Sequence, residues 1–191
     1  MNEARIFHNS ARDPVLDTGN PSKKPLAFHQ RLSGYAPTPL VRLKDLAKKL
    51  GVAEIYLKDE SSRLALPSFK ILGASWAVYR ALSQRLGFDF ESWRTLDDLH
   101  NLIRPLGAVA VVSATDGNHG RAVARMAALL SLKAKIFVPK GTAVSRIQAI
   151  ESEGAQVIEV GETYEEAVEH AASEEAQGAL LIQDTAWSGY E

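Results

Sequence analysis

Several residue types and patterns are missing from this chain, and each absence narrows the range of its functions. None of the 191 residues is cysteine, which excludes disulfide bonds and metal sites built on thiolates. Neither sign of charge predominates, because 22 lysines and arginines stand against 23 acidic residues, so there is no basic footprint for nucleic acid or an anionic membrane. No apolar run approaches the roughly 20 residues of a membrane helix, and the N-terminus has no signal-peptide core. We therefore expect a cytoplasmic protein without nucleic-acid or membrane partners.

The residues that are present describe an ordinary globular protein. Hydrophobic residues make up 46% of the chain and charged residues 24%, which is enough for a sizeable core. His8, His29, His100 and His170 are scattered without the spacing of metal ligands, so we assign no metal.

The order of apolar segments and turns predicts an α/β fold. Residues 1–38 are polar and carry four prolines, which favours an extended N-terminal arm before a folded region over 39–191. In that region strands and helices alternate, which indicates a parallel sheet with flanking helices on both faces. The expected helices span 41–50, 69–86, 96–103, 119–130, 143–153 and 163–177, and the expected strands span 54–59, 108–112, 134–138, 156–160 and 179–182.

The turn Ser113-Ala-Thr-Asp-Gly-Asn-His-Gly120 has the composition of a ligand-binding loop. It follows the expected strand 108–112 and leads into the expected helix 119–130, so backbone N–H groups should gather there at a helix N-terminus. In open parallel sheets the ligand crevice lies at such a strand end. Gly117 and Gly120 would let a ligand approach the backbone closely. We expect this turn to hold a polar ligand.

Lys70 stands in an unusual place, in the first turn of the expected helix 69–86. A cation there opposes the positive end of the helix dipole, so an ordinary surface lysine would be better placed at the other end. In partly apolar and electropositive surroundings its amine would form a Schiff base with an aldehyde. A lysine on a helix is more often a solvated side chain. Here the turn before Lys70 and the turn 113–120 both have the composition of ligand-binding loops, which favours the chemical role.

The order of these landmarks resembles the fold-type II enzymes that depend on pyridoxal 5′-phosphate (PLP), the group of the tryptophan synthase β-subunit. Thr38-Pro-Leu40 resembles their opening segment, Ser68-Phe-Lys70 their lysine segment, and Thr115-Asp-Gly-Asn-His119 their asparagine loop. Within the group, Asp116 and the final stretch 183–191 most resemble the diaminopropionate ammonia-lyase family, as does the Ile-Leu-Gly-Ala that follows the lysine.

This resemblance covers residues 35–191 and only about the first half of the family's length. It implies that 39–191 are the N-terminal part of a tryptophan synthase β-like fold, including most of the small domain. The chain departs from the family at Leu64-Ala65, where relatives tend to carry an aromatic residue and a glycine.

The resemblance also implies a role for each site residue. Lys70 would hold PLP as a Schiff base and act as a general base at the substrate Cα. Asp116 would be a second base on the opposite face, so that both enantiomers of 2,3-diaminopropionate would yield pyruvate and ammonia. Asn118 would hydrogen-bond the cofactor's ring oxygen, and the Thr115 hydroxyl would bind the substrate carboxylate. The remaining expected site residues are Phe69, Gly117 and His119 on the cofactor side and Ser113 on the substrate side.

Structural explanations for some of these residues stay open. Asp116 is also explained as a helix N-cap or a turn residue, and Asn118 as a left-handed turn residue. His119 is also explained as a capping residue or one that fills a polar pocket.

Functional alternatives stay open as well. Family members carry a glycine-rich phosphate cradle in their second half, and no such cluster follows Gly120 here. We therefore expect a fragment, a truncated form or an interrupted reading frame, active as a lyase only within a longer chain whose full-length form is a homodimer. One alternative is a related PLP enzyme that performs β-elimination or β-replacement on serine, threonine or cysteine. The other is a non-catalytic remnant.

Overall fold

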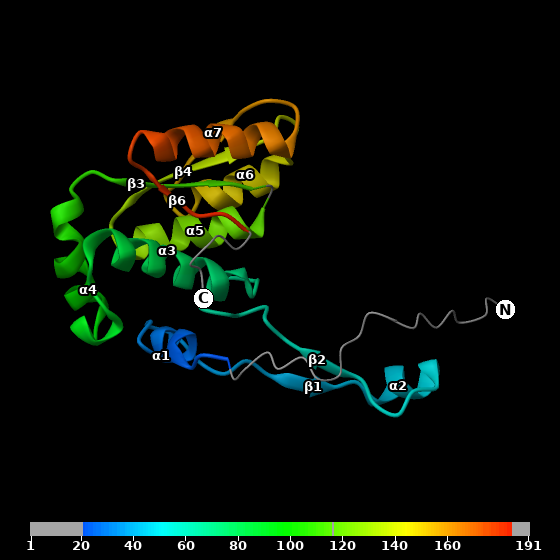
Figure 1. Ribbon diagram of the computed structural model, residues 1–191. Coiled ribbons are helices and arrows are strands. Elements are labelled where there is room, and N and C mark those ends of the chain that lie inside the picture. Colours follow the sequence, from blue (N-terminus) through cyan, green and yellow to red (C-terminus); the bar gives the residue numbers. More distant parts are fainter. Residues whose placement is uncertain (1–20, 116, 185–191) are drawn as a thin grey trace, which may run out of the picture.

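The computed structural model describes residues 21–115 and 117–184, and Figure 1 shows an α/β body from which a smaller hairpin region projects. The helices are α1 (Lys24–Gln30), α2 (Lys44–Leu50), α3 (Lys70–Leu86), α4 (Leu96–Ile103), α5 (Asn118–Leu129), α6 (Val144–Glu151) and α7 (Tyr164–Ala176), with short 3-10 turns at Phe90–Ser92 and Arg104–Leu106. The strands are β1 (Leu40–Arg42), β2 (Tyr56–Lys58), β3 (Ala110–Ala114), β4 (Lys133–Val138), β5 (Gln156–Glu159) and β6 (Leu180–Leu181). No helix in these described ranges is long and apolar enough to cross a membrane.

The main sheet confirms the predicted fold class. Its four strands run in the order β5-β4-β3-β6, and all three pairings are parallel. Helix α7 packs on one face of the sheet, while α5 packs on the other face with α3 and α6 against it (Figure 1). Right-handed crossovers through helices produce such a two-faced parallel sheet.

Local sequence signals explain where the helices begin and end. Thr95 and Thr163 open α4 and α7 as capping boxes, in which each threonine side chain accepts the N–H of an acidic residue three positions on. Helix α3 ends at Gly87, whose φ of 72° lies in the left-handed region that glycine adopts without strain.

The core beneath α3 includes a residue from the predicted extended arm. Within 21–38, the segment Lys24–Gln30 forms helix α1 instead of an extended chain. Phe28 is fully buried, with its ring centroid 5.0 Å from that of Tyr79 and 5.4 Å from that of Trp76. The arm prediction is wrong here because Pro25 lies in the first turn of the helix, where no backbone N–H is needed, so it does not disturb the helix.

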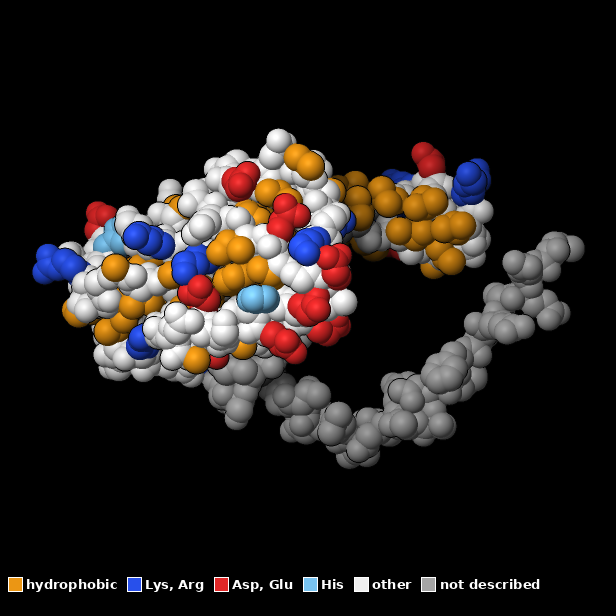
Figure 2. Space-filling model, turned by 90° about the horizontal axis from the view of Figure 1, so that it is seen from above, with side chains coloured by type: hydrophobic (Ala, Val, Ile, Leu, Met, Phe, Trp, Pro, Cys, Tyr) orange, Lys and Arg blue, Asp and Glu red, His pale blue; other side chains and the backbone are white. Residues whose placement is uncertain are grey.

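The prediction for the region around β1 is also wrong in part. The sequence predicts one helix over 41–50, but Leu40–Arg42 forms a strand that pairs antiparallel with Tyr56–Lys58, and only Lys44–Leu50 is helical. A three-residue strand directly before a helix is too short to show a period of its own. Figure 2 shows hydrophobic side chains gathered on the projecting lobe, where this hairpin and α2 lie.

Candidate active site

The turn after β3 is built around the hydroxyl of Thr115. Its Oγ1 accepts hydrogen bonds from the N–H of Gly117 at 3.1 Å and of Gly120 at 3.2 Å, and its own N–H donates to the carbonyl of Phe137 on β4 at 3.0 Å. Thr115 therefore ties the end of the sheet to the start of α5. Because the hydroxyl still has one hydrogen to donate, it can also contact an anionic ligand.

Gly120 allows α5 to pack closely on this turn. A Cβ at this position would overlap the Thr115 methyl group and lie 2.8 Å from Cγ2 of Ile136. The close approach explains a glycine here through packing between helix and strand.

Lys70 lies in the first turn of α3, as the sequence predicts, and is its first residue; its side chain is 34% exposed. Its backbone N–H donates to Oγ of Ser68 at 3.2 Å, and the N-cap residue of the helix is Phe69. Its Nζ donates to both carboxylate oxygens of Asp184, at 2.6 and 2.8 Å. The surroundings are thus not electropositive as expected, because the end of β6 brings a carboxylate to the amine.

His119 joins this pair from the first turn of α5. The imidazole is 5% exposed; its Nε2 lies 3.2 Å from the carbonyl oxygen of Ile182, and its Nδ1 lies 3.5 Å from Oδ1 of Asp184. Since a carbonyl only accepts, Nε2 carries the hydrogen. Burial lowers the pKa of His119, and the Ile182 hydrogen bond and the Asp184 charge oppose that shift only in part. The histidine is therefore neutral near pH 7, and Lys70 is the cation that pairs with Asp184.

One cleft of about 350 Å³ collects most of the predicted site residues. Lys70, Thr115, Gly117, Asn118 and His119 all line it. Ser113 does not, because it is fully buried within β3, and Phe69 does not, although 61% of its surface is exposed. Asp116 lies outside the described residues.

Sequence reasoning missed two residues that line the same cleft, Asp184 and Arg146. Asp184 lies three residues beyond the end of β6, at the same end of the sheet as the turn after β3. Its position after a strand is a signal that could have revealed it, but the adjacency of β6 and β3 is not visible in the sequence. Arg146 lies in the first turn of α6, where an ordinary surface arginine is the usual interpretation.

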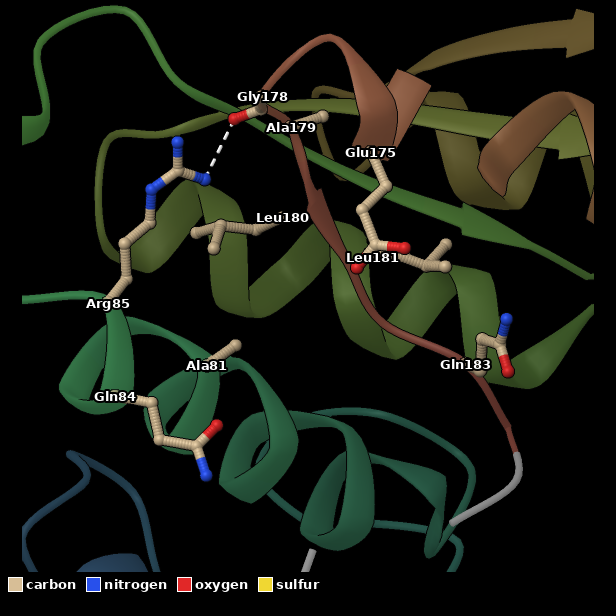
Figure 3. Close-up of a pocket in the computed structure, with 9 residues that line it drawn as sticks. All are labelled: Ala81, Gln84, Arg85, Glu175, Gly178, Ala179, Leu180, Leu181 and Gln183. Carbon is tan, nitrogen blue, oxygen red and sulfur yellow. Dashed lines mark hydrogen bonds between the residues drawn. The ribbon is translucent and has the colours of Figure 1, made fainter. Parts of the chain in front are cut away.

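A larger cavity of about 630 Å³ lies along the free edge of β6 and is a less suitable site (Figure 3). Side chains of α3, the end of α7 and β6 line it, and Nη1 of Arg85 donates to the carbonyl of Gly178 at 2.8 Å. None of the predicted site residues lines this cavity. We therefore place the chemistry in the Lys70 cleft, where an amine, an imidazole and a carboxylate meet.

A parallel sheet that brings a lysine and an asparagine turn into one cleft is the arrangement expected of fold-type II PLP enzymes. Comparison with known proteins agrees with this class. Residues 32–191 match the family model described as pyridoxal-phosphate dependent enzyme, and the chain belongs to this family. It is 41% identical over 193 residues to diaminopropionate ammonia-lyase of Salmonella typhimurium, an alignment that covers 100% of this chain and 48% of that protein.

Two further relatives extend the comparison. The crystal structure of Escherichia coli diaminopropionate ammonia lyase in apo form superposes with a TM-score of 0.79 at 39% identity, covering 88% of this chain and 46% of that chain. A biosynthetic threonine dehydratase of Arabidopsis thaliana is 31% identical over 134 residues, 70% of this chain and 19% of that protein. The chain thus has the fold-type II architecture and spans about half the length of the diaminopropionate ammonia-lyases it matches.

The described cleft residues fit part of a PLP site. The amine of Lys70 suits the aldehyde, the amide of Asn118 suits a ring hydroxyl, and the first N–H groups of α5 have no partners within the helix. The glycines after Gly120 in the described part, at 141, 154, 161 and 178, stand singly in separate turns and form no cradle for a phosphate.

Proposed function

We propose that this chain is the lysine-bearing half of a PLP-dependent ammonia-lyase that cleaves 2,3-diaminopropionate to pyruvate and ammonia. The observation that carries the proposal is the position of Lys70 Nζ in one cleft with Asn118, His119 and Asp184. Supporting it, diaminopropionate ammonia-lyases match the chain at 41% and 38% identity over nearly its whole length. The activity belongs to the longer protein, because the chain spans only about half of those relatives.

Lys70 has two tasks in this proposal. PLP, when bound, supplies an electron sink for the electron pair left at the substrate Cα. Nζ of Lys70 holds the cofactor and, once the substrate amine has displaced it, takes the proton from Cα. Asp184, which accepts both hydrogen bonds from Nζ, keeps the amine in the cleft before the cofactor binds.

The other cleft residues bind and orient. Asn118 and the Thr115 hydroxyl would contact the cofactor ring and the substrate carboxylate, respectively. His119 is a positioning residue, because its hydrogen bond to Ile182 holds the start of α5 against the segment that carries Asp184. Asp116 remains the proposed second base for the D-enantiomer.

A related β-eliminating enzyme that acts on serine or threonine is the alternative. The 31% identity to a threonine dehydratase over 70% of this chain supports it. Both functions need the same lysine and the same asparagine turn, so the substrate distinguishes them.

The test is the release of pyruvate when the chain is supplied with the remaining half of the Salmonella relative as a separate polypeptide, together with PLP. We expect release from both enantiomers of 2,3-diaminopropionate and at least about tenfold slower release from serine. Lys70→Ala should abolish release, and Asp116→Asn should abolish it for the D-enantiomer only. Faster release from serine would favour the alternative, and no release from any of these substrates would contradict both functions.

The cytoplasmic location and the homodimeric full-length form that the sequence favours are further parts of this proposal. Sedimentation of a full-length form should give the mass of a dimer, and a monomeric form with full activity would contradict that part.

A further inference from the structure

The larger cavity, along the free edge of β6, has no task in the proposed function. Its volume of about 630 Å³ lies within the range of small-molecule sites. The residues that line it, from Ala81 on α3 to Gln183 after β6, are those labelled in Figure 3, and we call it the β6-edge cavity. None of these described residues lines the Lys70 cleft, so the two spaces are separate.

A cation enters the β6-edge cavity from α3. Nη1 of Arg85 donates to the carbonyl of Gly178 at 2.8 Å, which holds the guanidinium beside the start of β6 (Figure 3). Because a guanidinium carries five N–H donors, Arg85 keeps donors for a ligand after making this bond. A carboxylate is the group that the planar guanidinium binds best, through two parallel hydrogen bonds.

An anion enters the same cavity from α7. Glu175 extends from this helix toward Leu181, and Figure 3 shows it and Arg85 on opposite sides of Leu180. Within the described residues the Glu175 carboxylate has no hydrogen bond or ion pair, whereas that of the neighbouring Glu174 pairs with Lys135 at 2.8 Å. Glu175 can therefore accept an ammonium group.

The free edge of β6 adds backbone groups to the cavity. In the described part of the chain β6 pairs only with β3, and the N–H of Ile182 donates to the carbonyl of Val112 at 2.8 Å. Successive residues of a strand direct their backbone groups to opposite edges, so those of Leu181 face away from β3, on the side of the β6-edge cavity. Backbone groups at such an edge favour a ligand that can donate and accept hydrogen bonds.

These groups together fit a zwitterion of the amino-acid class. Arg85 matches a carboxylate, Glu175 matches an ammonium group, and Ala81 and Leu180 offer an apolar wall to a side chain. The lining contains one arginine and no lysine, so a polyphosphate would meet the repulsion of Glu175 with a single cation to bind it.

From these observations we infer that the β6-edge cavity is a second ligand site, which binds a zwitterion of the amino-acid class with Arg85 at its carboxylate and Glu175 at its ammonium group. Free amino acids and short peptides share this chemistry, and the test compares the two. The inference goes beyond the proposed function and does not depend on it.

An NMR titration without cofactor tests the inference. The isotope-labelled 191-residue chain is titrated with L-leucine and, separately, with the dipeptide leucyl-leucine. We expect at least one of these probes to cause saturable shifts of the amides of 81–85 and 178–183 below about 20 mM. The N-acetylated and the C-amidated forms of that probe each lack one charge and should bind at least about fivefold more weakly.

Matched variants locate the contact. Arg85→Gln and Glu175→Gln should each weaken binding at least about fivefold, and Glu175→Gln breaks no hydrogen bond or ion pair in the described structure. Arg104→Gln and Glu169→Gln, at exposed residues outside the cavity, are the controls and should not weaken it. Lys70→Ala should leave this binding unchanged as well.

The outcomes separate the two sources of the ligand and the two sites. Tighter binding of leucine favours a free amino acid, and tighter binding of leucyl-leucine favours a peptide. No saturable shift with either probe, unchanged affinity in both cavity variants, or shifts confined to the Lys70 cleft would overturn the inference. A chain that binds a probe in the β6-edge cavity but releases no pyruvate with the second half of its relative would contradict the proposed function alone.

Discussion

Among single residues, Asp184 has the largest effect on the site. A lysine at the start of a helix faces the positive end of the dipole, and the Asp184 carboxylate supplies the opposite charge at 2.6 Å from Nζ. The buried, neutral His119, whose hydrogen is on Nε2, lies 3.5 Å from the same carboxylate and donates no hydrogen bond to it. The cleft thus holds the Lys70 cation and the Asp184 anion side by side, and Arg146 also lines it.

The turn before Lys70 is strained at two residues. Leu64 and Ala65 have φ values of 49° and 60°, in the left-handed region that favours glycine. This geometry gives a physical reason for the glycine that relatives tend to carry at this turn.

Ala65→Gly should therefore stabilise the protein. The left-handed conformation costs an alanine about 1–2 kcal/mol, and the extra chain entropy of glycine offsets about 0.5–1 kcal/mol of the relief. We expect the free energy of unfolding in urea to rise by about 0.5–1 kcal/mol. Ala53→Gly, at an exposed loop residue without positive φ, is the control and should lower it. A loss of stability in Ala65→Gly equal to that of the control would contradict the strain.

Glu60 should make stability depend on pH. Hydrogen bonds from Arg63 lower the pKa of Glu60 to about 2, from an ordinary value of 4.5. Because the folded pKa is the lower one, the stabilisation is fully present above about pH 4.5 and is lost as the pH falls through about 2.

Glu60→Gln should then lower the free energy of unfolding by about 2 kcal/mol at pH 7, and the difference from wild type should shrink between pH 4.5 and 2. Urea unfolding at several pH values measures it. Glu162→Gln, which breaks an exposed pair with Lys140, is the control and should have almost no effect. A difference that stays constant down to pH 2 would show that the Glu60 charge does not matter.

At the scale of elements, the junction of β3 and α5 positions the site. Thr115 and Gly120 hold the strand end and the helix start together, so the orientation of Asn118 depends on close packing at Gly120. The sequence predicted this strand, turn and helix because a short apolar run, a group of turn residues and a helical pattern follow one another there.

Gly120→Ala should disrupt this junction. The added methyl group would overlap the Thr115 side chain, so we expect a loss of about 1–3 kcal/mol in the free energy of unfolding. Gly73→Ala, on α3 with nothing within 4 Å of the added carbon, is the matched control and should leave stability equal or higher. Equal free energies of unfolding for the two variants would mean that the turn accommodates the added methyl group and that close packing at Gly120 does not position the site.

Elements whose pattern was short or ambiguous could not be predicted. The strands β1 and β2 have too few residues for a period. Pro21 before α1 and Pro25 in its first turn hid a helix whose Phe28 packs in the core. The cleft was predictable where one segment carries the chemistry, as in Lys70 and the turn from Thr115 to His119. Asp184 and Arg146 depend on which strands become neighbours, and long-range pairing of this kind leaves no mark on a single sequence.

For the whole molecule, the main sheet and the β1–β2 hairpin differ in how far their apolar side chains are covered. Helices cover both faces of the main sheet, whereas Leu40, Val41 and Leu57 of the hairpin are exposed. The Lys70 cleft likewise has its amine and amide but no phosphate cradle in the described part. The chain spans about half the length of the diaminopropionate ammonia-lyases it matches.

The most direct measurement of the central claim, that Lys70 carries the cofactor, is the position of a PLP adduct trapped by borohydride reduction. The chain is combined with the second half of the Salmonella relative, exposed to PLP at equimolar concentration, reduced, digested and analysed by mass spectrometry. The expected result is one adduct on the peptide that contains Lys70, lost in Lys70→Ala. Labelling spread over exposed lysines such as Lys58 and Lys140, unchanged in Lys70→Ala, would contradict the claim.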